Sequence, residues 1–258
     1  MFGFTKWRRK RIRNRPFPAE WLTILDKNVP YYALLSAEEQ KELQGHIQVF
    51  LAEKYFEGCG GLELTDEIRV TVAAQACVLL LNRDTDYYPD LVSILVYPHM
   101  YVAPDSEHME DGIVFEDHQV RLGESWQQGI VVLSWYDVKY GAADIHDGQN
   151  VVLHEFAHQL DGESGWTEGA PELEGRSQYT AWARVLGKEY NRLIADLHEH
   201  RPNLFGSYAA TNPAEFFAVI TECFFEKPKR LKKKHPELYE TLKDFFHQDP
   251  ASRRKSGD

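Results

Sequence analysis

The sequence lacks the features of a membrane protein, a secreted protein or a disulfide-rich protein. No stretch reaches the roughly 18 consecutive apolar residues that a membrane span needs, and the basic residues 1–15 are not followed by the apolar run of a secretory signal. Only three cysteines are present, Cys59, Cys77 and Cys223, and they form no CxxC pair. Such scattered cysteines make a poor disulfide framework. We therefore expect a cytoplasmic protein with reduced thiols and no membrane association.

Charge is unevenly distributed along the chain, although its overall composition is that of a soluble globular protein of 258 residues with a net charge of −11. Residues 1–15 carry seven basic residues and no acidic one, and residues 227–258 carry ten basic and five acidic residues. Residues 16–226 thus hold 12 of the 29 basic and 35 of the 40 acidic residues. Basic ends on an acidic body are compatible with nucleic-acid contact, but short basic runs are more often simply solvated. We expect no direct nucleic-acid binding.

The spacing of apolar residues divides the chain into a helical front, a small sheet and further helices. Residues 1–18 lack an apolar stripe and are predicted to form a flexible basic tail. Helical spacing covers 19–57, with a capping box at Ser36 and Glu39, and then Asp66 to Leu81 behind the predicted N-cap Thr65. Short β-branched segments follow, and predict strands at Val92–Val96, Gly112–Leu122 and Gly129–Trp135.

Helical spacing returns in the second half of the chain. The predicted helices are Asp147–Leu160, Tyr179–His200, Pro213–Phe225 and Pro236–His247. Helices, then a small sheet, then helices indicate an α+β fold. We expect one domain over 19–248, with a helical front at 19–81 and the sheet and site helices at 82–248, followed by a flexible tail at 249–258.

The motif with the clearest chemistry is His154-Glu155-Phe156-Ala157-His158, an HExxH pattern inside an apolar helical segment. On a helix the two histidines lie one turn apart on the same face, so both imidazoles can bind one Zn²⁺ while Glu155 reaches a water molecule at the metal. The alternative is a chance match with two structural histidines. That alternative is costly, because each histidine would be desolvated among apolar residues without a metal or another partner.

Zinc sites of this kind need a third protein ligand, and the sequence offers several carboxylates. The extended HExxHxxGxxH pattern fails, because Asp161 and Ser164 stand where it requires Gly and His. Glu172 and Glu174 lie in a loop, whereas Glu215 opens a strongly apolar helix and Glu222 follows it two turns later. We favour Glu215 as the ligand, although with Asn212 as N-cap it also fits a capping box. Glu222 is either a ligand or a residue that supports one.

Three segments together resemble the Mlc titration factor A family. They are the run from His154 to Asp161, the run from Tyr208 to Ala218 that contains Asn212-Pro213-Ala214-Glu215, and the strand segment Gly129–Trp135. The resemblance extends from about Trp21 to Phe246, nearly the whole chain. It implies a bacterial cytosolic zinc metallopeptidase of the gluzincin type, with a zincin-like fold built on a small mixed sheet and similar to the catalytic core of anthrax lethal factor.

The resemblance also implies roles for individual residues. His154, His158 and Glu215 would be the ligands of one zinc ion, Glu155 the general base and Tyr208 the active-site tyrosine that donates to the oxyanion. The implied activity is aminopeptidase-like hydrolysis of peptides, and the implied partner is the Mlc repressor of the glucose phosphotransferase genes. We expect the extended substrate to pair with the strand Gly112–Leu122. The alternative function is that of a repressor-sequestering protein with secondary peptidase activity.

Overall fold

Helices and three short strands make up the part of the chain that the computed structural model describes, residues 2–99, 129–163, 165, 168–173 and 175–253. The front of the chain comprises α1 (Phe2–Arg13), α2 (Ala19–Asn28), the 3-10 turn η1 (Pro30–Leu34), α3 (Ala37–Glu53), β1 (Tyr55–Gly58) and α4 (Asp66–Val78). The centre comprises β2 (Ser93–Tyr97), β3 (Ile130–Ser134), α6 (Trp135–Ala143) and α7 (Val151–Gly162). The last part comprises α8 (Arg176–His198), η2 (Tyr208–Ala210), α9 (Pro213–Glu226), α10 (Pro228–Lys234), α11 (Pro236–Phe246) and η3 (Pro250–Ser252).

The described strands form a parallel sheet in the order β1-β2-β3. Phe56 pairs with Ile94 and Ile94 with Val131, so one row of buried apolar side chains crosses the sheet. A parallel pair needs a crossover connection, which α4 provides between β1 and β2. The predicted strands at Val92–Val96 and Gly129–Trp135 correspond to β2 and β3. The described strands are parallel where we predicted a mixed sheet, and the predicted strand Gly112–Leu122 lies outside the described residues.

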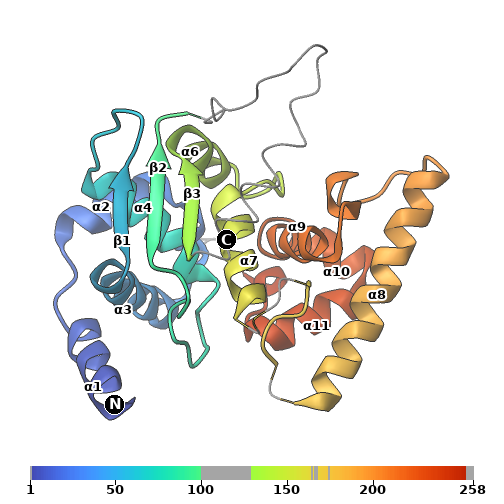
Figure 1. The fold of residues 1–258 in the computed structure, drawn as a ribbon, viewed down its shortest axis with the longest axis horizontal. Coiled ribbons are helices and arrows are strands. Elements are labelled where there is room, and N and C mark those ends of the chain that lie inside the picture. Colours follow the sequence, from blue (N-terminus) through green and yellow to red (C-terminus); the bar gives the residue numbers. More distant parts are fainter. Residues whose placement is uncertain (1, 100–128, 164, 166–167, 174, 254–258) are drawn as a thin grey trace.

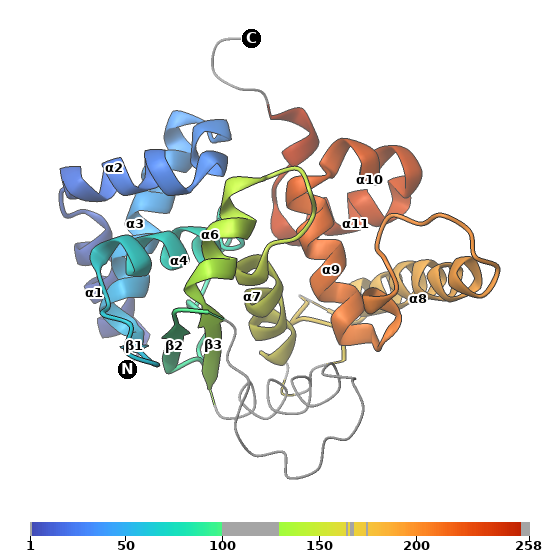
Figure 2. The ribbon, with the colours of Figure 1, turned by 90° about the horizontal axis from the view of Figure 1, so that it is seen from above.

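α7 lies between two groups of elements (Figures 1 and 2). The sheet and α1–α4 stand on one side, and α8–α11 stand on the other. α7 contacts α4, α6 and β3 on the first side and α9 on the second. The segment that carries the HExxH motif is therefore at the junction between the helical front and the C-terminal helices.

Local capping signals in the sequence are confirmed where the structure describes them. Ser36 and Glu39 form the predicted capping box at the start of α3, and the Thr65 hydroxyl accepts the backbone N–H of Ile68 at the start of α4. β1, α6 and α10 were not predicted. They contain four, nine and seven residues respectively, and such short elements carry too few apolar repeats to establish a period.

The N-terminal segment corrects the prediction of a flexible tail. Residues 2–13 form α1, which packs against α3 and buries Ile12 to 7% exposure. The guanidinium group of Arg9 makes a two-pronged contact with the Glu53 carboxylate, with its Nη2 2.9 Å from Oε2, and also reaches Asp86 at 2.7 Å. Acidic groups of the front thus hold the basic helix, and these long-range partners could not be identified from the local sequence.

The predicted C-terminal tail is also partly ordered. Residues 250–252 form η3, and the Arg253 guanidinium lies 2.6 Å from the Glu39 carboxylate and donates to Gln248 at 2.8 Å. Because Glu39 belongs to α3, this ion pair ties the end of the described chain to its front. The remaining residues of the predicted tail, 254–258, lie outside the described residues.

No helix in the described ranges combines the length and the apolar character that crossing a bilayer requires.

Candidate metal centre

Two histidines face the same direction from α7. The helix is capped by Asn150, whose side-chain oxygen accepts the backbone N–H of Leu153 at 3.0 Å. His154 and His158 lie one turn apart within this helix, and their Nε2 atoms are 3.2 Å apart. The local sequence alone is sufficient for this arrangement, since it requires only that the segment be helical.

Packing of the apolar side chains sets the direction in which the histidines point. Five apolar residues of α7 are buried: Val152, Leu153, Phe156, Ala157 and Leu160. The ring of Phe156 contacts the rings of Phe50 and Tyr88, with centroid distances of 5.7 and 4.9 Å. These contacts anchor α7 to the helical front and leave its histidine face directed towards α9.

Glu215 reaches both histidines from the first turn of α9. Asn212 caps that helix by accepting the backbone N–H of Glu215 at 2.9 Å. The Glu215 carboxylate is directed to the histidines, with Oε2 3.0 Å from Nε2 of His154 and 3.4 Å from Nε2 of His158. Of the other candidates in the loop, Glu172 is exposed and Glu174 lies outside the described residues.

The spacing of these three donor atoms fits a small tetrahedral cation. His154, His158 and Glu215 form a group that could hold a metal ion. Zinc bonds of 2.0–2.1 Å arranged tetrahedrally place neighbouring ligand atoms about 3.3 Å apart. The three separations observed here, 3.0, 3.2 and 3.4 Å, bracket that value. Two imidazole nitrogens with one carboxylate oxygen are also a donor set that zinc accepts while keeping one coordination position open.

Glu222 contacts His154 on the opposite side of the imidazole ring. Its Oε1 atom lies 2.8 Å from Nδ1 of His154, and its Oε2 atom accepts the backbone N–H of Asn150 at 2.5 Å. A carboxylate at Nδ1 leaves Nε2 as the nitrogen that can bind a metal. The sequence left the role of Glu222 open between ligand and supporting residue, and its position beside Nδ1 is that of a supporting residue.

Burial and neighbouring carboxylates act in opposite directions on the charge of the cluster. Burial alone would lower the pKa of His154, but its hydrogen bonds with Glu215 and Glu222 raise that pKa well above 6.5. Burial lowers the pKa of His158 to about 4. Burial alone would raise the pKa of Glu215, yet its hydrogen bonds with His154 and His158 bring it below the usual range. The carboxylates of Glu215 and Glu222 thus favour positive charge at His154.

Glu155 and Tyr208 lie at the cluster in different environments. Glu155, between the two histidines in sequence, is only 5% exposed. Tyr208 belongs to η2, which contacts α9, and its ring centroid is 5.8 Å from that of His154. Tyr208 is 43% exposed, so its phenol is on the solvent-accessible side of the cluster. The structure thus brings together the five residues to which the resemblance assigns roles.

Asp161 is a supporting residue to which the sequence assigned no role. Its two carboxylate oxygens accept the backbone N–H groups of Gly169 and Ala170, each at 2.7 Å. Gly169 has a φ of +76° and lies so close to α9 that a Cβ atom there would be 2.4 Å from the carbonyl oxygen of Pro213. Asp161 therefore holds the following loop against the first turn of α9, which carries Glu215. The only feature of the sequence that could have indicated this role is the position of Asp161, three residues after His158.

The amino-acid sequence of the chain was compared with known families and proteins, and a family matches. Residues 4–247 match the profile of the family described as glucose-regulated metallo-peptidase M90. A protein of Synechocystis sp., described as uncharacterised, is 41% identical over 245 residues, which cover 95% of this chain and 89% of that protein. Mlc titration factor A of Klebsiella pneumoniae subsp. pneumoniae is 33% identical over 88% of this chain and 86% of its own length. Mlc titration factor A of Salmonella arizonae is 31% identical, with coverage of 96% and 97%.

Proposed function

Because the chain belongs to the glucose-regulated metallo-peptidase M90 family, we propose that it is a cytoplasmic zinc-dependent peptidase with aminopeptidase-like activity. The observation that carries this proposal is the cluster of three donor atoms separated by 3.0, 3.2 and 3.4 Å. In the proposal, Nε2 of His154, Nε2 of His158 and the Glu215 carboxylate hold one zinc ion. A zinc ion bound there would supply Lewis acidity, which would lower the pKa of a water molecule and polarise the substrate carbonyl.

The protein's own groups move the protons of the reaction. Glu155 accepts a proton from the attacking water as the new C–O bond forms, and it returns that proton to the amine as the C–N bond breaks. Glu155 is only 5% exposed, so the proton that it holds is shielded from bulk water. Tyr208, on the solvent-accessible side of His154, donates its phenol hydrogen to the oxyanion that forms at the carbonyl. Glu222 orients His154 through Nδ1.

The negative charge around the site supports a preference for substrates with a free amino terminus. Glu215 and Glu222 both contact His154, and residues 16–226 carry most of the acidic residues of the chain. Such a field favours the approach of a cationic ammonium group. The substrate strand predicted at Gly112–Leu122 lies outside the described residues, so peptide binding there remains a prediction.

Paired substitutions test the peptidase proposal. We expect His154→Ala to lose stoichiometric zinc, measured by metal analysis of the purified protein. We expect Glu155→Gln to retain zinc and to lose hydrolysis of peptides, because the amide cannot accept the proton. Unchanged hydrolysis by Glu155→Gln would exclude Glu155 as the general base, and retention of zinc by His154→Ala would exclude the ligand set.

We propose as a second function that the chain binds a transcriptional repressor of the Mlc type. The support is that relatives 31–33% identical over most of the chain bear the name Mlc titration factor A. Binding and hydrolysis are separable if Glu155→Gln, which we expect to keep the fold and the metal, still binds the repressor and relieves repression. Titration of purified repressor with the wild type and this variant tests this, and absence of binding by both proteins would contradict the proposal.

A further inference from the structure

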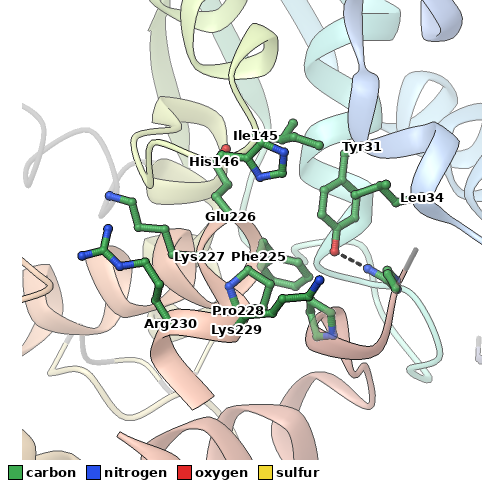
Figure 3. Close-up of a pocket in the computed structure, with 12 residues that line it drawn as sticks. Tyr31, Leu34, Ile145, His146, Phe225, Glu226, Lys227, Pro228, Lys229 and Arg230 are labelled. Atoms are coloured by element: carbon green, nitrogen blue, oxygen red, sulfur yellow. Dashed lines mark hydrogen bonds between the residues drawn. The ribbon is translucent and has the colours of Figure 1, made fainter. Parts of the chain in front are cut away.

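A second cavity lies at the other end of α9 from the candidate metal centre. Its volume is about 620 Å³, within the range of small-molecule sites. It is bounded by η1, the segment between α6 and α7, the end of α9, and α10 (Figure 3). Its lining includes Glu226 but none of the three candidate metal ligands. Eleven residues of helix separate Glu215 from Glu226, a rise of about 16 Å, so this cavity is distinct from the metal centre.

Three cations without carboxylate partners line this cavity. Within the described ranges, Lys227, Lys229 and Arg230 form no ion pair, whereas Lys232, one helical turn on, lies 3.7 Å from the Glu240 carboxylate. The side chains of Lys227 and Arg230 extend in the same direction, on the side of the cavity away from Tyr31 (Figure 3). Together they bring positive charge to the cavity without an ion pair from any described carboxylate.

The backbone makes room for one of these cations. Gly148 has a φ of +71°, and a Cβ atom there would lie 2.8 Å from Nζ of Lys227. The Lys227 ammonium therefore lies directly against the chain just before α7. Lys227 is half-buried, so its charge is less screened by water than that of an exposed lysine.

The acidic group at the cavity is already occupied by contacts with the protein. Glu226 is the one carboxylate among the described lining residues, and its two oxygens accept hydrogen bonds from the Asn150 side chain at 3.1 Å and the Gln149 backbone at 3.0 Å. Both contacts direct it towards the start of α7. Arg253, also a lining residue, is paired with Glu39 at 2.6 Å. The cations available to a ligand are thus Lys227, Lys229 and Arg230.

The remaining wall of the cavity is apolar. It is formed by the side chains of Tyr31, Leu34, Ile145, Phe225, Pro228 and Pro250. Tyr31 and Phe225 are buried and contact one another edge to face at 6.0 Å between centroids. An apolar wall beside a cluster of cations suits a ligand with an anionic group at one end and an apolar body at the other.

We infer that this cavity binds a small organic phosphate monoester, with its phosphate at the charged ends of Lys227 and Arg230 and its apolar body directed towards the apolar wall. A phosphate monoester carries a charge of about −1.5 to −2 at pH 7, so it matches several cations better than a carboxylate does. Charged hydrogen bonds to its oxygens are stronger than neutral ones. This inference does not depend on the proposed peptidase function.

The test uses phenyl phosphate as the probe in isothermal titration calorimetry at physiological salt, with inorganic phosphate and benzoate as comparison ligands. We expect phenyl phosphate to bind more tightly than either, since only it supplies both the dianion and the apolar ring. Equal binding of all three, or no measurable binding of phenyl phosphate at millimolar concentration, would overturn the inference.

A matched pair of double variants tests the location. Lys227→Gln/Arg230→Gln is expected to weaken phenyl phosphate binding by at least about tenfold, through loss of two charged hydrogen bonds. Lys233→Gln/Lys234→Gln removes the same charge from exposed residues that do not line the cavity, and is expected to change binding by less than about twofold. Equal losses in the two double variants would overturn the location. Thermal unfolding of both variants verifies that each remains folded.

Binding at the metal centre is the competing explanation, and one further variant separates the two sites. We expect His154→Ala, treated with a chelator, to bind phenyl phosphate as tightly as the wild type. The reason is that none of the three candidate metal-binding residues lines the cavity. Loss of binding in this protein would assign the phosphate to the metal and overturn the inference. If His154→Ala loses peptidase activity but still binds phenyl phosphate, the assignment of the phosphate to the cavity stands.

Discussion

Glu222 joins His154 to the start of the helix on which His154 lies. One of its oxygens is 2.8 Å from Nδ1 of His154, and the other accepts the backbone N–H of Asn150 at 2.5 Å. The carboxylate is therefore held at both oxygens, and it can define the orientation of the imidazole ring. This relationship gives Glu222 a role different from that of Glu215, although both lie on one face of α9.

Substitution of Glu222 should weaken zinc binding without abolishing it. We expect Glu222→Ala to reduce zinc affinity by about 10- to 100-fold, because removal of the group that orients a metal-binding histidine usually has an effect of this size. Competition with a chromophoric chelator measures the affinity. Glu215→Ala provides the comparison and should lose stoichiometric zinc. If Glu222→Ala loses zinc as completely as Glu215→Ala, Glu222 is a zinc ligand, contrary to its position at Nδ1.

Removal of one phenolic hydroxyl should impair hydrolysis selectively. We expect Tyr208→Phe to lower kcat by about 10²–10³, the usual effect of losing one donor to an oxyanion, with zinc content unchanged. Tyr140→Phe is the control, since Tyr140 is also exposed, at 60%, and belongs to α6. Kinetics on a peptide substrate distinguish the two variants. If Tyr208→Phe retains the wild-type kcat, Tyr208 has no part in stabilising the oxyanion.

The buried Glu226 should make stability depend on pH. Burial raises its pKa to about 8 from 4.5, so between these values the folded protein binds more protons than the unfolded chain. Its contribution to stability is complete below pH 4.5 and is lost as pH rises through 8. Relative to Glu226→Gln, the wild type should lose up to about 1 kcal/mol of unfolding free energy per pH unit in this window.

Chemical denaturation from pH 5 to 8 measures this dependence. Glu57→Gln, at an exposed position of β1, is the control and should run parallel to the wild type. Parallel curves for the wild type and Glu226→Gln would show that the carboxyl group of Glu226 does not titrate differently in the folded and unfolded states.

The N-terminal helix should contribute to stability through one buried side chain. We expect Ile12→Ala to lower the free energy of unfolding by about 2 kcal/mol, at the lower end for a buried isoleucine because α1 lies at the edge of the fold. Phe4→Ala changes a larger side chain on the same helix, but Phe4 is 71% exposed, so we expect less than about 0.5 kcal/mol. Urea denaturation measures both. Equal small effects would show that α1 does not pack in solution and would favour a flexible tail.

Elements with strong local signals could be predicted, and those that depend on distant partners could not. The caps of α3 and α4 lie within three residues of the groups they bind, so Ser36 and Thr65 were recognisable in the sequence. α1 was missed because its arginines pair with Glu53 and Asp86, about forty or more residues away. β1 was missed because four residues acquire a strand conformation only by pairing with β2.

The sequence by itself determined that His154 and His158 face one direction with Glu155 between them, because that arrangement follows from residue spacing on any helix. Only the tertiary structure decided which carboxylate meets which nitrogen. Glu215 is 61 residues beyond His154 and lies at Nε2, whereas Glu222 is 68 residues beyond it and lies at Nδ1. That choice depends on how α9 packs against α7, and packing between elements distant in sequence is determined by the whole core.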